Sequence, residues 1–400
     1  MKKNPEVDRR HFIQTTAAGI TGLTIVNSSS VRGSQAHSRL RLGIIGCGGR
    51  GRFIGRLFRE HTATEIVSLH DYFPDKVQAL AEEFQVDESH CHIGLYGYRE
   101  LLEDTVDAVA IMSPPYFHPE QTLDSVKAGK HVFLSKPVAV DVHGCQTILS
   151  AADRARGRLS ILVDFQTRAD ALFREASRRI HSGAIGKPVL GQVYYQAGRL
   201  NPKAEGDSPE ARLRNWVFDQ RLSGDIIVEQ NIHVIDVANW YLNSHPVRAF
   251  GTGGRKARTD VGDCWDHYIA TFWYPEDVLV DFSSGQYLRG YSDLCIRVYG
   301  SDGTVDSHYG GLLQITGEHE WAGGTNKDLY RTGAIENIKQ FHSSVLNGTP
   351  LFETVPPSVE SNLTSILGRM AAYRQATVTW EEMMASGERI EADLDIVDKK

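Results

Sequence analysis

The chain has 400 residues, of which 41% are hydrophobic and 23% charged, a composition typical of a globular enzyme and a length that indicates two domains. The formal net charge is −7, and no basic run follows residue 36, which argues against a nucleic-acid partner. The five cysteines are widely spaced without a CxxC pair, a pattern that favours buried free thiols over a disulfide framework.

The first 36 residues have the layout of an export signal. The twin arginines Arg9 and Arg10 precede an apolar run at residues 15–26, and small residues follow at 34–36. This run is shorter than the roughly 20 residues that a membrane-spanning helix needs, and no later stretch is apolar enough to span a membrane. We expect a twin-arginine signal peptide, read by the twin-arginine translocase, and a periplasmic or secreted protein. The alternative is a disordered tail with two adjacent arginines by chance.

A glycine-rich stretch overlaps the end of an expected strand at residues 40–46 and precedes an expected helix. The strand sequence LRLGIIG has the continuous apolar character of a strand buried on both faces. In the pattern G-x-G-x-x-G, the first glycine allows a tight turn, the second lets a pyrophosphate approach, and the third lets helix and strand pack closely. The helix N-terminus then binds the phosphates. We expect cofactor contacts from Gly46, Cys47, Gly48, Gly49, Arg50 and Gly51.

An acidic residue ends the next expected strand, at residues 64–71. Asp71 lies 20 residues after the last glycine of the loop, which is the spacing at which a carboxylate binds the adenosine ribose hydroxyls. Because a carboxylate there repels a 2′-phosphate, the sequence favours NAD over NADP. The alternative is an acid that only ends the strand or caps the next helix.

Strands and helices continue to alternate up to residue 137. Expected strands at 106–113 and 131–137 flank an expected helix that begins near His118, which predicts an α/β fold with a doubly wound parallel sheet. Ligands of such sheets bind at the carboxyl ends of the strands. We therefore expect Ser113, Pro114, His118 and Lys136 to face the cofactor.

Several segments resemble one enzyme family. KAGKHVFLSKPVAVD (residues 127–141) is similar to a signature of the glucose–fructose oxidoreductase / inositol dehydrogenase (Gfo/Idh/MocA) family, and SGDIIVEQNIHVIDVANWYL (223–242) resembles its catalytic segment. The resemblance extends from Leu40 to Trp380. It implies an N-terminal Rossmann domain, residues 38–160, and a C-terminal α+β domain with a large, open, mostly antiparallel sheet, residues 161–400. A helix near 358–376 is expected to pack back towards the first domain, and the open sheet to favour a homo-oligomer.

The resemblance also implies three catalytic residues. Lys136 matches the family lysine that hydrogen-bonds the reacting oxygen, a role suited to a cation beside a developing alkoxide. His233 matches the catalytic histidine, whose imidazole can take a hydroxyl proton near neutral pH. Glu229 stands where the family usually has Asp, and positions i and i+4 of one helix share a face, so we expect it to orient His233. Ser135 replaces the family's usual Glu, so the lysine lacks that neighbouring anion.

Other residues are expected near the substrate, and a metal is not. Gln166, Arg168 and Trp216 are candidate substrate contacts beside His233. The stretch 317–330 is expected to be a loop, either over the cleft or on the surface elsewhere. SHCHIG at residues 89–94 is a conceivable metal motif, but consecutive residues rarely converge on one ion, and we predict no metal site.

These features favour an NAD-dependent oxidoreductase that transfers hydride to or from a carbinol carbon of a sugar, a sugar derivative or a cyclitol. An exported protein would have to keep its cofactor, because free nicotinamide cofactor is scarce outside the cytoplasm. The first alternative is therefore a redox-neutral NAD-dependent glycosidase or lyase with a tightly bound cofactor. The second is a non-catalytic protein that binds NAD or a sugar.

Overall fold

The computed structural model describes residues 39–394, and the predicted signal peptide lies outside them. The N-terminal half contains a six-stranded parallel sheet in the order β3-β2-β1-β4-β5-β6, so the predicted doubly wound sheet is confirmed. Its strands are β1 (Leu40–Ile45), β2 (Thr64–Asp71), β3 (Cys91–Ile93), β4 (Ala108–Ile111), β5 (His131–Ser135) and β6 (Ile161–Asp164). Strand β6 lies beyond the domain boundary expected at residue 160.

Helices cover both faces of this sheet, which explains why its central strands are apolar throughout. Leu42 and Ile44 of β1 belong to the core formed with α2 (Gly49–His61), α3 (Pro74–Phe84) and the distant α13 (Leu329–Leu346). Val109 and Ile111 of β4 instead belong to the core formed with α4 (Tyr98–Glu103), α5 (His118–Lys127) and α6 (Val142–Ala155). Helix α13 thus returns from the C-terminal third of the chain to complete the first half.

The C-terminal half is built on a nine-stranded sheet in the order β14-β13-β12-β11-β7-β10-β9-β8-β15. All neighbouring strands run antiparallel except the parallel pair of β7 and β10. The strands are β7 (Pro188–Gly198), β8 (Arg248–Gly254), β9 (His267–Trp273), β10 (Leu279–Leu288), β11 (Asp293–Gly300), β12 (Gly303–His308), β13 (Leu312–Gly317), β14 (Trp321–Thr325) and β15 (Val378–Thr379).

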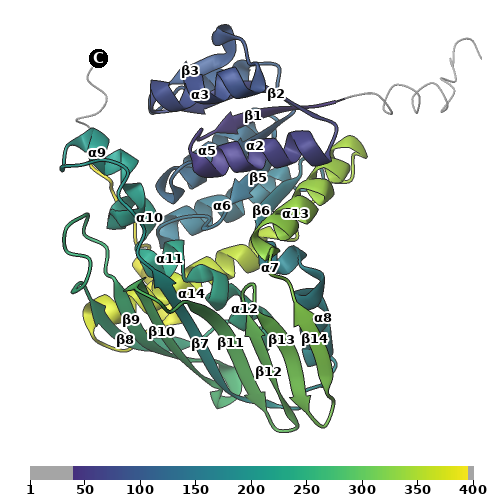
Figure 1. Cartoon of the computed structure of the whole chain (residues 1–400), viewed down its shortest axis with the longest axis vertical. Coiled ribbons are helices and arrows are strands. Elements are labelled where there is room, and N and C mark those ends of the chain that lie inside the picture. The colour runs from purple at the N-terminus through teal and green to yellow at the C-terminus, as the bar shows by residue number, and fades with distance from the viewer. Residues whose placement is uncertain (1–38, 395–400) are drawn as a thin grey trace, which may run out of the picture. The chain divides into compact units, whose positions relative to one another are not determined.

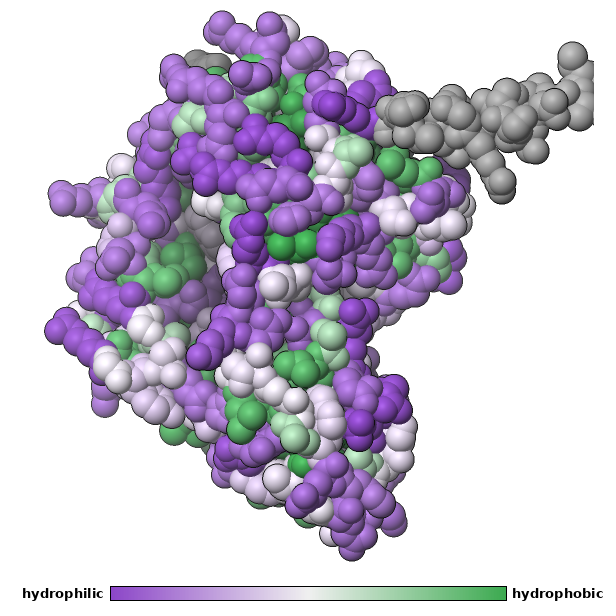
Figure 2. All heavy atoms as spheres, turned by 45° about the vertical axis from the view of Figure 1, so that its right-hand side comes forward, coloured by the Kyte–Doolittle hydropathy of each residue, from purple (hydrophilic) through white to green (hydrophobic). Residues whose placement is uncertain are grey.

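The two faces of the large sheet differ in composition. In β10, Val280 and Phe282 are buried towards the helices, whereas Leu279 on the opposite face is 37% exposed. The covering helices include α8 (Ala171–His181), α12 (Ile232–Leu242) and α14 (Val355–Arg374), and Figure 1 shows α12 and α14 over this sheet. On the face seen in Figure 2, hydrophobic residues form small patches among hydrophilic ones.

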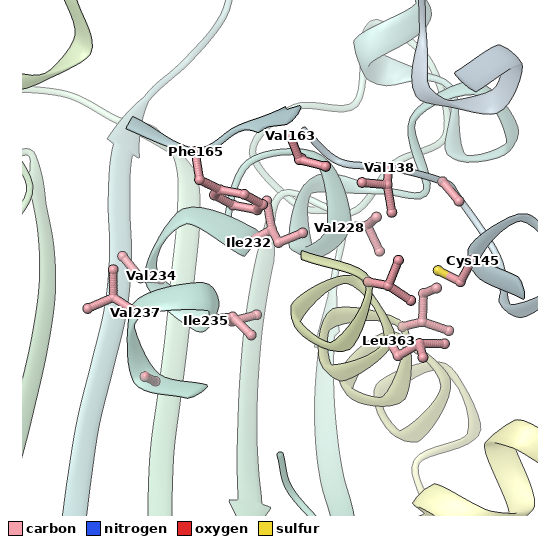
Figure 3. Close-up of a cluster of buried hydrophobic side chains, with 14 of the residues drawn as sticks. Val138, Cys145, Val163, Phe165, Val228, Ile232, Val234, Ile235, Val237 and Leu363 are labelled. Carbon is pink, nitrogen blue, oxygen red and sulfur yellow. The ribbon is translucent and has the colours of Figure 1, made fainter. Parts of the chain in front are cut away.

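Helix α14 joins the two halves through a common core. Figure 3 shows Val138 and Cys145 of the first half beside Val228 and Leu363 of the second, and all four belong to one buried cluster. The Asn362 side chain accepts a hydrogen bond from the Val138 N–H at 3.0 Å and donates one to the Ala139 carbonyl at 3.1 Å. The segment that follows the cofactor-side strand β5 is therefore fixed directly to α14.

Three further expectations concern the 317–330 stretch, the cysteines and membrane-spanning segments. The loop expected at residues 317–330 is wrong for its middle, because residues 321–325 form β14, the edge strand of the large sheet, and residues from Leu329 onward begin α13. All five cysteines are free thiols, of which only Cys91 is partly exposed. Within the described residues, no helix has both the length and the apolar character needed to cross a membrane.

The shorter helical segments complete the described chain and lie mainly before β8. They are η1 (Glu88–His90), η2 (Pro115–Phe117), α7 (Gln166–Ala169), α9 (Pro209–Arg214), η3 (Trp216–Phe218), α10 (Gln220–Ser223), α11 (Ile226–Glu229), η4 (Pro275–Asp277) and α15 (Trp380–Ser386).

Candidate active site

The first and third glycines of the glycine-rich turn are required by its geometry. Gly46 has a φ of +97°, and a Cβ there would lie 2.6 Å from the Met112 backbone. A Cβ on Gly51 would lie 2.0 Å from the Gly46 carbonyl oxygen. Larger residues at either position would therefore separate α2 from the strand ends β1 and β4.

The middle glycines leave a space that fits a pyrophosphate. Apart from the neighbouring residues of the chain and the backbone of α2 itself, no described atom lies within 4 Å of where a Cβ would stand on Gly48 or Gly49. Helix α2 begins at Gly49, and no described side chain caps its first amides. Uncapped N–H groups and the helix dipole attract anions, and here the backbone can be approached closely. The turn therefore fits the phosphates of a dinucleotide.

Asp71 supports the turn and faces the same cleft. Its Oδ2 accepts a hydrogen bond from the Cys47 N–H at 2.8 Å, and its Oδ1 accepts one from the Phe73 N–H at 3.0 Å. The carboxylate thus caps local backbone, as the alternative interpretation proposed, and still lines a cleft of about 580 Å³, open solvent included. We call this the glycine-loop cleft; it is lined by Gly46, Gly48, His70, Asp71, Tyr72, Phe73, Lys76, Gly94, Leu95, Met112, Ser113, Pro114, Phe117, Gln121, Leu213 and Trp216.

A second cleft adjoins the first and contains the predicted catalytic residues. Met112, Ser113 and Trp216 line both clefts, so the two are continuous. The second has a volume of about 1020 Å³, open solvent included. We call it the lysine–histidine cleft; it is lined by Arg50, Met112, Ser113, Pro115, Ser135, Lys136, Asp164, Gln166, Tyr195, Leu200, Trp216, Glu229, Gln230, His233 and Tyr330.

Lys136 follows the carboxyl end of β5, and its peptide bond to Pro137 is cis. Its Nζ donates to the backbone oxygen of Glu229 at 2.5 Å and to Oε1 of the same residue at 3.1 Å. The two side chains are 16% and 12% exposed, so the pair is mostly shielded from water. The ammonium group is therefore held in one place on the cleft wall.

The expected role of Glu229 as a partner of His233 is not what the structure shows. Helix α11 ends at Glu229 and α12 begins at Ile232, so Glu229 and His233 do not lie on one continuous helix. The carboxylate instead contacts Lys136 and supplies the anion that Ser135 does not. The Ser135 hydroxyl donates to the Ile111 carbonyl at 3.0 Å.

His233 lines the cleft at the first turn of α12, beside the rings of Phe165 and Tyr309. Its Nδ1 is covered and has no hydrogen-bond partner among the described residues, so Nε2 is the nitrogen that can face the cleft. Burial, followed by the positive charges of Lys136 and Arg50, lowers the pKa of His233 well below its usual value. The ring is neutral near pH 7 and can accept a proton.

Arg50, which is expected from the sequence to contact the cofactor, extends into the second cleft. Its guanidinium pairs with the buried carboxylate of Asp164, lies 4.8 Å from the centre of the Tyr330 ring, and lines the lysine–histidine cleft. Asn337 of α13 donates to Asp164 Oδ1 at 2.8 Å. The covered Nη1 of Arg50 has no hydrogen-bond partner within the described chain.

The remaining candidates divide into two groups. Gln166 and Trp216 line the cleft, whereas His118 and Arg168 are absent from the described lining. The buried His118 ring lies between the carbonyl oxygens of Ser113 at 2.8 Å and Pro137 at 2.7 Å, and burial lowers its pKa to about 4. Arg168 pairs with the buried Asp236 at 2.9 Å. Both therefore support the cleft walls from behind.

Asp164, Tyr195, Gln230 and Tyr330 line the lysine–histidine cleft without having been singled out from the sequence. Asp164 ends β6, so the rule that ligands bind at the carboxyl ends of parallel strands could have found it. The other three come from the C-terminal half, where no such rule applies.

The possible metal ligands are engaged by other groups. His90 and His92 of SHCHIG both contact Asp104, at 3.0 and 2.9 Å. Among the described residues, Cys295, Asp306 and His308 form one group with compatible distances. There His308 lies between the carboxylates of Asp293 and Asp306, and Arg297 pairs with Asp306, so these side chains already have partners within the protein.

Comparisons with known proteins agree with this arrangement. Residues 40–163 match the model described as an oxidoreductase family with an NAD-binding Rossmann fold, and residues 173–306 match the GFO/IDH/MocA C-terminal domain. Inositol 2-dehydrogenase of Ralstonia nicotianae is 30% identical over 270 residues, which cover 66% of this chain and 72% of that protein. The chain belongs to the Gfo/Idh/MocA family of oxidoreductases.

Two other proteins extend the comparison over more of the chain. Myo-inositol 2-dehydrogenase of Thermotoga maritima is 24% identical over 328 residues, which cover 78% of this chain and 90% of that protein. The crystal structure of myo-inositol 2-dehydrogenase from Lactobacillus plantarum superposes with a TM-score of 0.69 at 21% identity, covering 86% of this chain and 99% of that one. The N-terminal half is thus the NAD-binding Rossmann domain of an oxidoreductase.

Proposed function

We propose that the protein oxidises or reduces a carbinol carbon of a sugar, a sugar derivative or a cyclitol, with NAD as the cofactor. The observation that carries this proposal is the continuity of the two clefts. The glycine-loop cleft fits a dinucleotide, and it opens at Ser113 and Trp216 into a cleft that holds a positioned cation and a neutral imidazole. Hydride removal from a secondary alcohol is accelerated when a base takes the hydroxyl proton and a hydrogen-bond donor stabilises the same oxygen.

In the oxidation direction, His233 accepts the hydroxyl proton, because its low pKa keeps the ring neutral at the start of the reaction. Lys136 donates a hydrogen bond to the same oxygen and stabilises its developing negative charge. Glu229 holds the ammonium group in place for this contact. Bound nicotinamide supplies the hydride acceptor or donor. In the reverse direction, protonated His233 returns the proton to the oxygen.

A substrate screen tests this proposal directly. Purified protein with NAD is mixed with a panel of cyclitols, aldoses and sugar derivatives, and NADH formation is followed by absorbance. Mass spectrometry of small molecules released from natively purified protein identifies candidates for the panel. NADH formation with one class of polyol, lost in Lys136→Met, is the expected result. If no compound of the panel is converted to a product, the result contradicts the proposal.

The redox-neutral alternative is favoured by one property of the sequence, its expected export signal. An exported enzyme with a resident cofactor would convert its substrate without accumulating NADH. Product formation without net NADH would therefore support the glycosidase or lyase reaction. A protein that binds NAD or a sugar without forming any product would be the non-catalytic binding protein.

The cofactor preference follows from Asp71. Its carboxylate lines the adenosine end of the glycine-loop cleft, where a 2′-phosphate would be repelled, so we propose NAD over NADP. Lys76 Nζ lies 3.9 Å from Asp71 Oδ1 and reduces this repulsion without removing it. Titration should show tighter binding of NADH than of NADPH. The Asp71→Asn substitution should bring the two dissociation constants closer together. Equal affinities in the unaltered protein would contradict this assignment.

Export and self-association complete the proposal. We infer that the protein leaves the cytoplasm by the twin-arginine route, which can be tested by replacing Arg9 and Arg10 with Lys and locating the protein in cell fractions. The uncovered face of the large sheet carries exposed apolar side chains, including Phe250, Ile269 and Leu312, which suit a homo-oligomer. Ile269→Glu should then lower the mass of the particle in solution.

A further inference from the structure

A short segment of the C-terminal half contacts the glycine-loop cleft. This segment, residues 209–218, comprises α9 and η3. Its Arg214 forms a bidentate ion pair with Asp75 in the first turn of α3. The Nη2–Oδ1 distance is 2.7 Å and the Nη1–Oδ2 distance is 3.1 Å. The same guanidinium lies 3.9 Å from the centre of the Phe73 ring. The segment is thus attached to the loop that follows Asp71.

Two side chains of the segment form part of the cleft wall. Leu213 and Trp216 line the glycine-loop cleft opposite the Rossmann residues, and Leu213 is only 4% exposed. Leu213 packs with Phe73, Leu222 and Ala392 in a small buried cluster, and Trp216 borders that cluster. The adenosine end of the cleft is therefore bounded by apolar groups from two parts of the chain, a surface that suits the flat faces of adenine.

The end of the described chain holds this segment in place. Residues 388–394 run from α6 towards α9: the His143 N–H donates to the Glu388 carbonyl at 3.0 Å, and the Ile390 N–H donates to Asp141 Oδ2 at 2.6 Å. Further along, the backbone oxygen of Asp393 accepts a hydrogen bond from Arg212 Nη1 of the segment at 3.5 Å, and the Asp393 carboxylate pairs with Arg221 of the neighbouring α10. Ala392 then reaches the cluster beneath Leu213. Residues 209–218 are thus attached both to the Rossmann half and to residues 388–394.

We propose that residues 209–218, held by residues 388–394, act as a clasp over the adenosine half of the bound dinucleotide and slow its release. The inference rests on the proposed function, because it takes the glycine-loop cleft as the NAD site. For the adenosine to leave, Leu213 and Trp216 must move away from Phe73, and the contacts of Arg214 with Asp75 and Phe73 must break. The clasp would keep the cofactor bound over many turnovers, as an enzyme outside the cytoplasm requires.

The test measures NADH release and does not depend on turnover. Protein loaded with NADH is mixed with an excess of NAD, and the fall in fluorescence of bound NADH gives the dissociation rate. Arg214→Ala removes both the ion pair and the ring contact and should speed release about tenfold. Asp75→Asn removes the ionic part alone and should speed release by a smaller factor, about threefold.

A matched control separates a local effect from a general one. Arg178 of α8 forms a comparable surface ion pair with Glu175, far along the chain from the clasp. Arg178→Ala should release NADH at the unaltered rate. Because Asp75 is 60% exposed in its side chain, Asp75→Asn keeps the test valid even where Arg214→Ala fails to fold.

The outcomes distinguish the two proposals. If the unaltered protein binds NADH and both clasp variants release it at the unaltered rate, the clasp is wrong and the proposed function stands. If the unaltered protein binds no NADH under any condition, the proposed function is wrong and the clasp falls with it. Faster release from Arg214→Ala and Asp75→Asn, with an unchanged rate for Arg178→Ala, supports the clasp.

Discussion

Replacing Glu229 by Gln tests whether Lys136 depends on its carboxylate partner. The Nζ–Oε1 distance of 3.1 Å corresponds to an attraction of about 5 kcal/mol at an effective dielectric constant of about 20. Much of this is offset by desolvation of the two groups, and the contact of Nζ with the Glu229 backbone oxygen survives the substitution. We expect a loss of about 1–2 kcal/mol of transition-state stabilisation, which lowers kcat about 5- to 30-fold.

The assay is a double-mutant cycle measured with NAD and the substrate found by screening. If Glu229 acts through Lys136, Glu229→Gln has no further effect on kcat once Lys136 is replaced by Met. In the His233→Ala background, Glu229→Gln should still lower kcat. The dissociation constant for NADH should change less than about threefold in these variants. The reason is that neither Glu229 nor Lys136 belongs to the described lining of the glycine-loop cleft. Glu120→Gln, which alters an exposed pair with Arg99, is the matched control and should leave kcat unchanged.

Two results would refute this reasoning. One is an unaltered kcat in Glu229→Gln, which would mean that Lys136 keeps its position without the carboxylate. The other is an effect that persists in Lys136→Met and disappears in His233→Ala. That pattern would show that Glu229 acts through the imidazole after all.

Four other substitutions have distinct expected outcomes. His233→Ala should lower kcat by about 10²–10⁴-fold while NADH still binds, as calorimetric titration would show; near-normal turnover would exclude the proposed base. His118 has a pKa of about 4 in the folded protein and about 6.5 unfolded, so the unfolded chain binds more protons between these values. The free energy of unfolding should therefore fall by about 3 kcal/mol from this group as pH drops from 6.5 to 4, and His118→Gln should flatten that slope in urea titrations at several pH values. Gly51→Ala should destabilise the fold by about 1–3 kcal/mol because its Cβ would overlap the Gly46 carbonyl, whereas Gly49→Ala should keep its melting temperature and bind NADH more weakly.

The sequence was most informative where local patterns determine structure. The apolar run of residues 40–46, the glycines at 46–51 and the acid at 71 predicted a strand, a tight glycine turn and a carboxylate beside it, and the structure contains all three. Because the carboxyl ends of parallel strands meet at one edge of a sheet, the sequence also predicts that Ser113 and Lys136 face the same site. The prediction that Lys136 and His233 share one cleft came from the family resemblance, because their spacing in the sequence does not indicate it.

The sequence was least informative where contacts are made between distant segments. The apolar run from Ile226 to Leu242 reads as one helix, and the break at residues 230–231 that redirects Glu229 to Lys136 leaves no signal in that pattern. Arg168 carries a charge suited to a substrate, but the buried Asp236 on another helix takes it as a partner. The glycines at 323 and 324 suggested a loop, and pairing with β13 overrides that preference.

The aromatic contact between α13 and the parallel sheet has a consequence for synthesis of the chain. Phe341 packs against Phe58 of α2 and Phe133 of β5, with ring centres 6.2 and 5.6 Å apart. A ribosome that adds about 5–20 residues per second reaches Phe341 roughly 15–60 s after Phe58. During that interval, the first half has an incomplete core and exposes the aromatic surface that α13 later covers. Chaperones that bind hydrophobic surface should therefore associate with the nascent chain at intermediate lengths and release it once α13 has emerged.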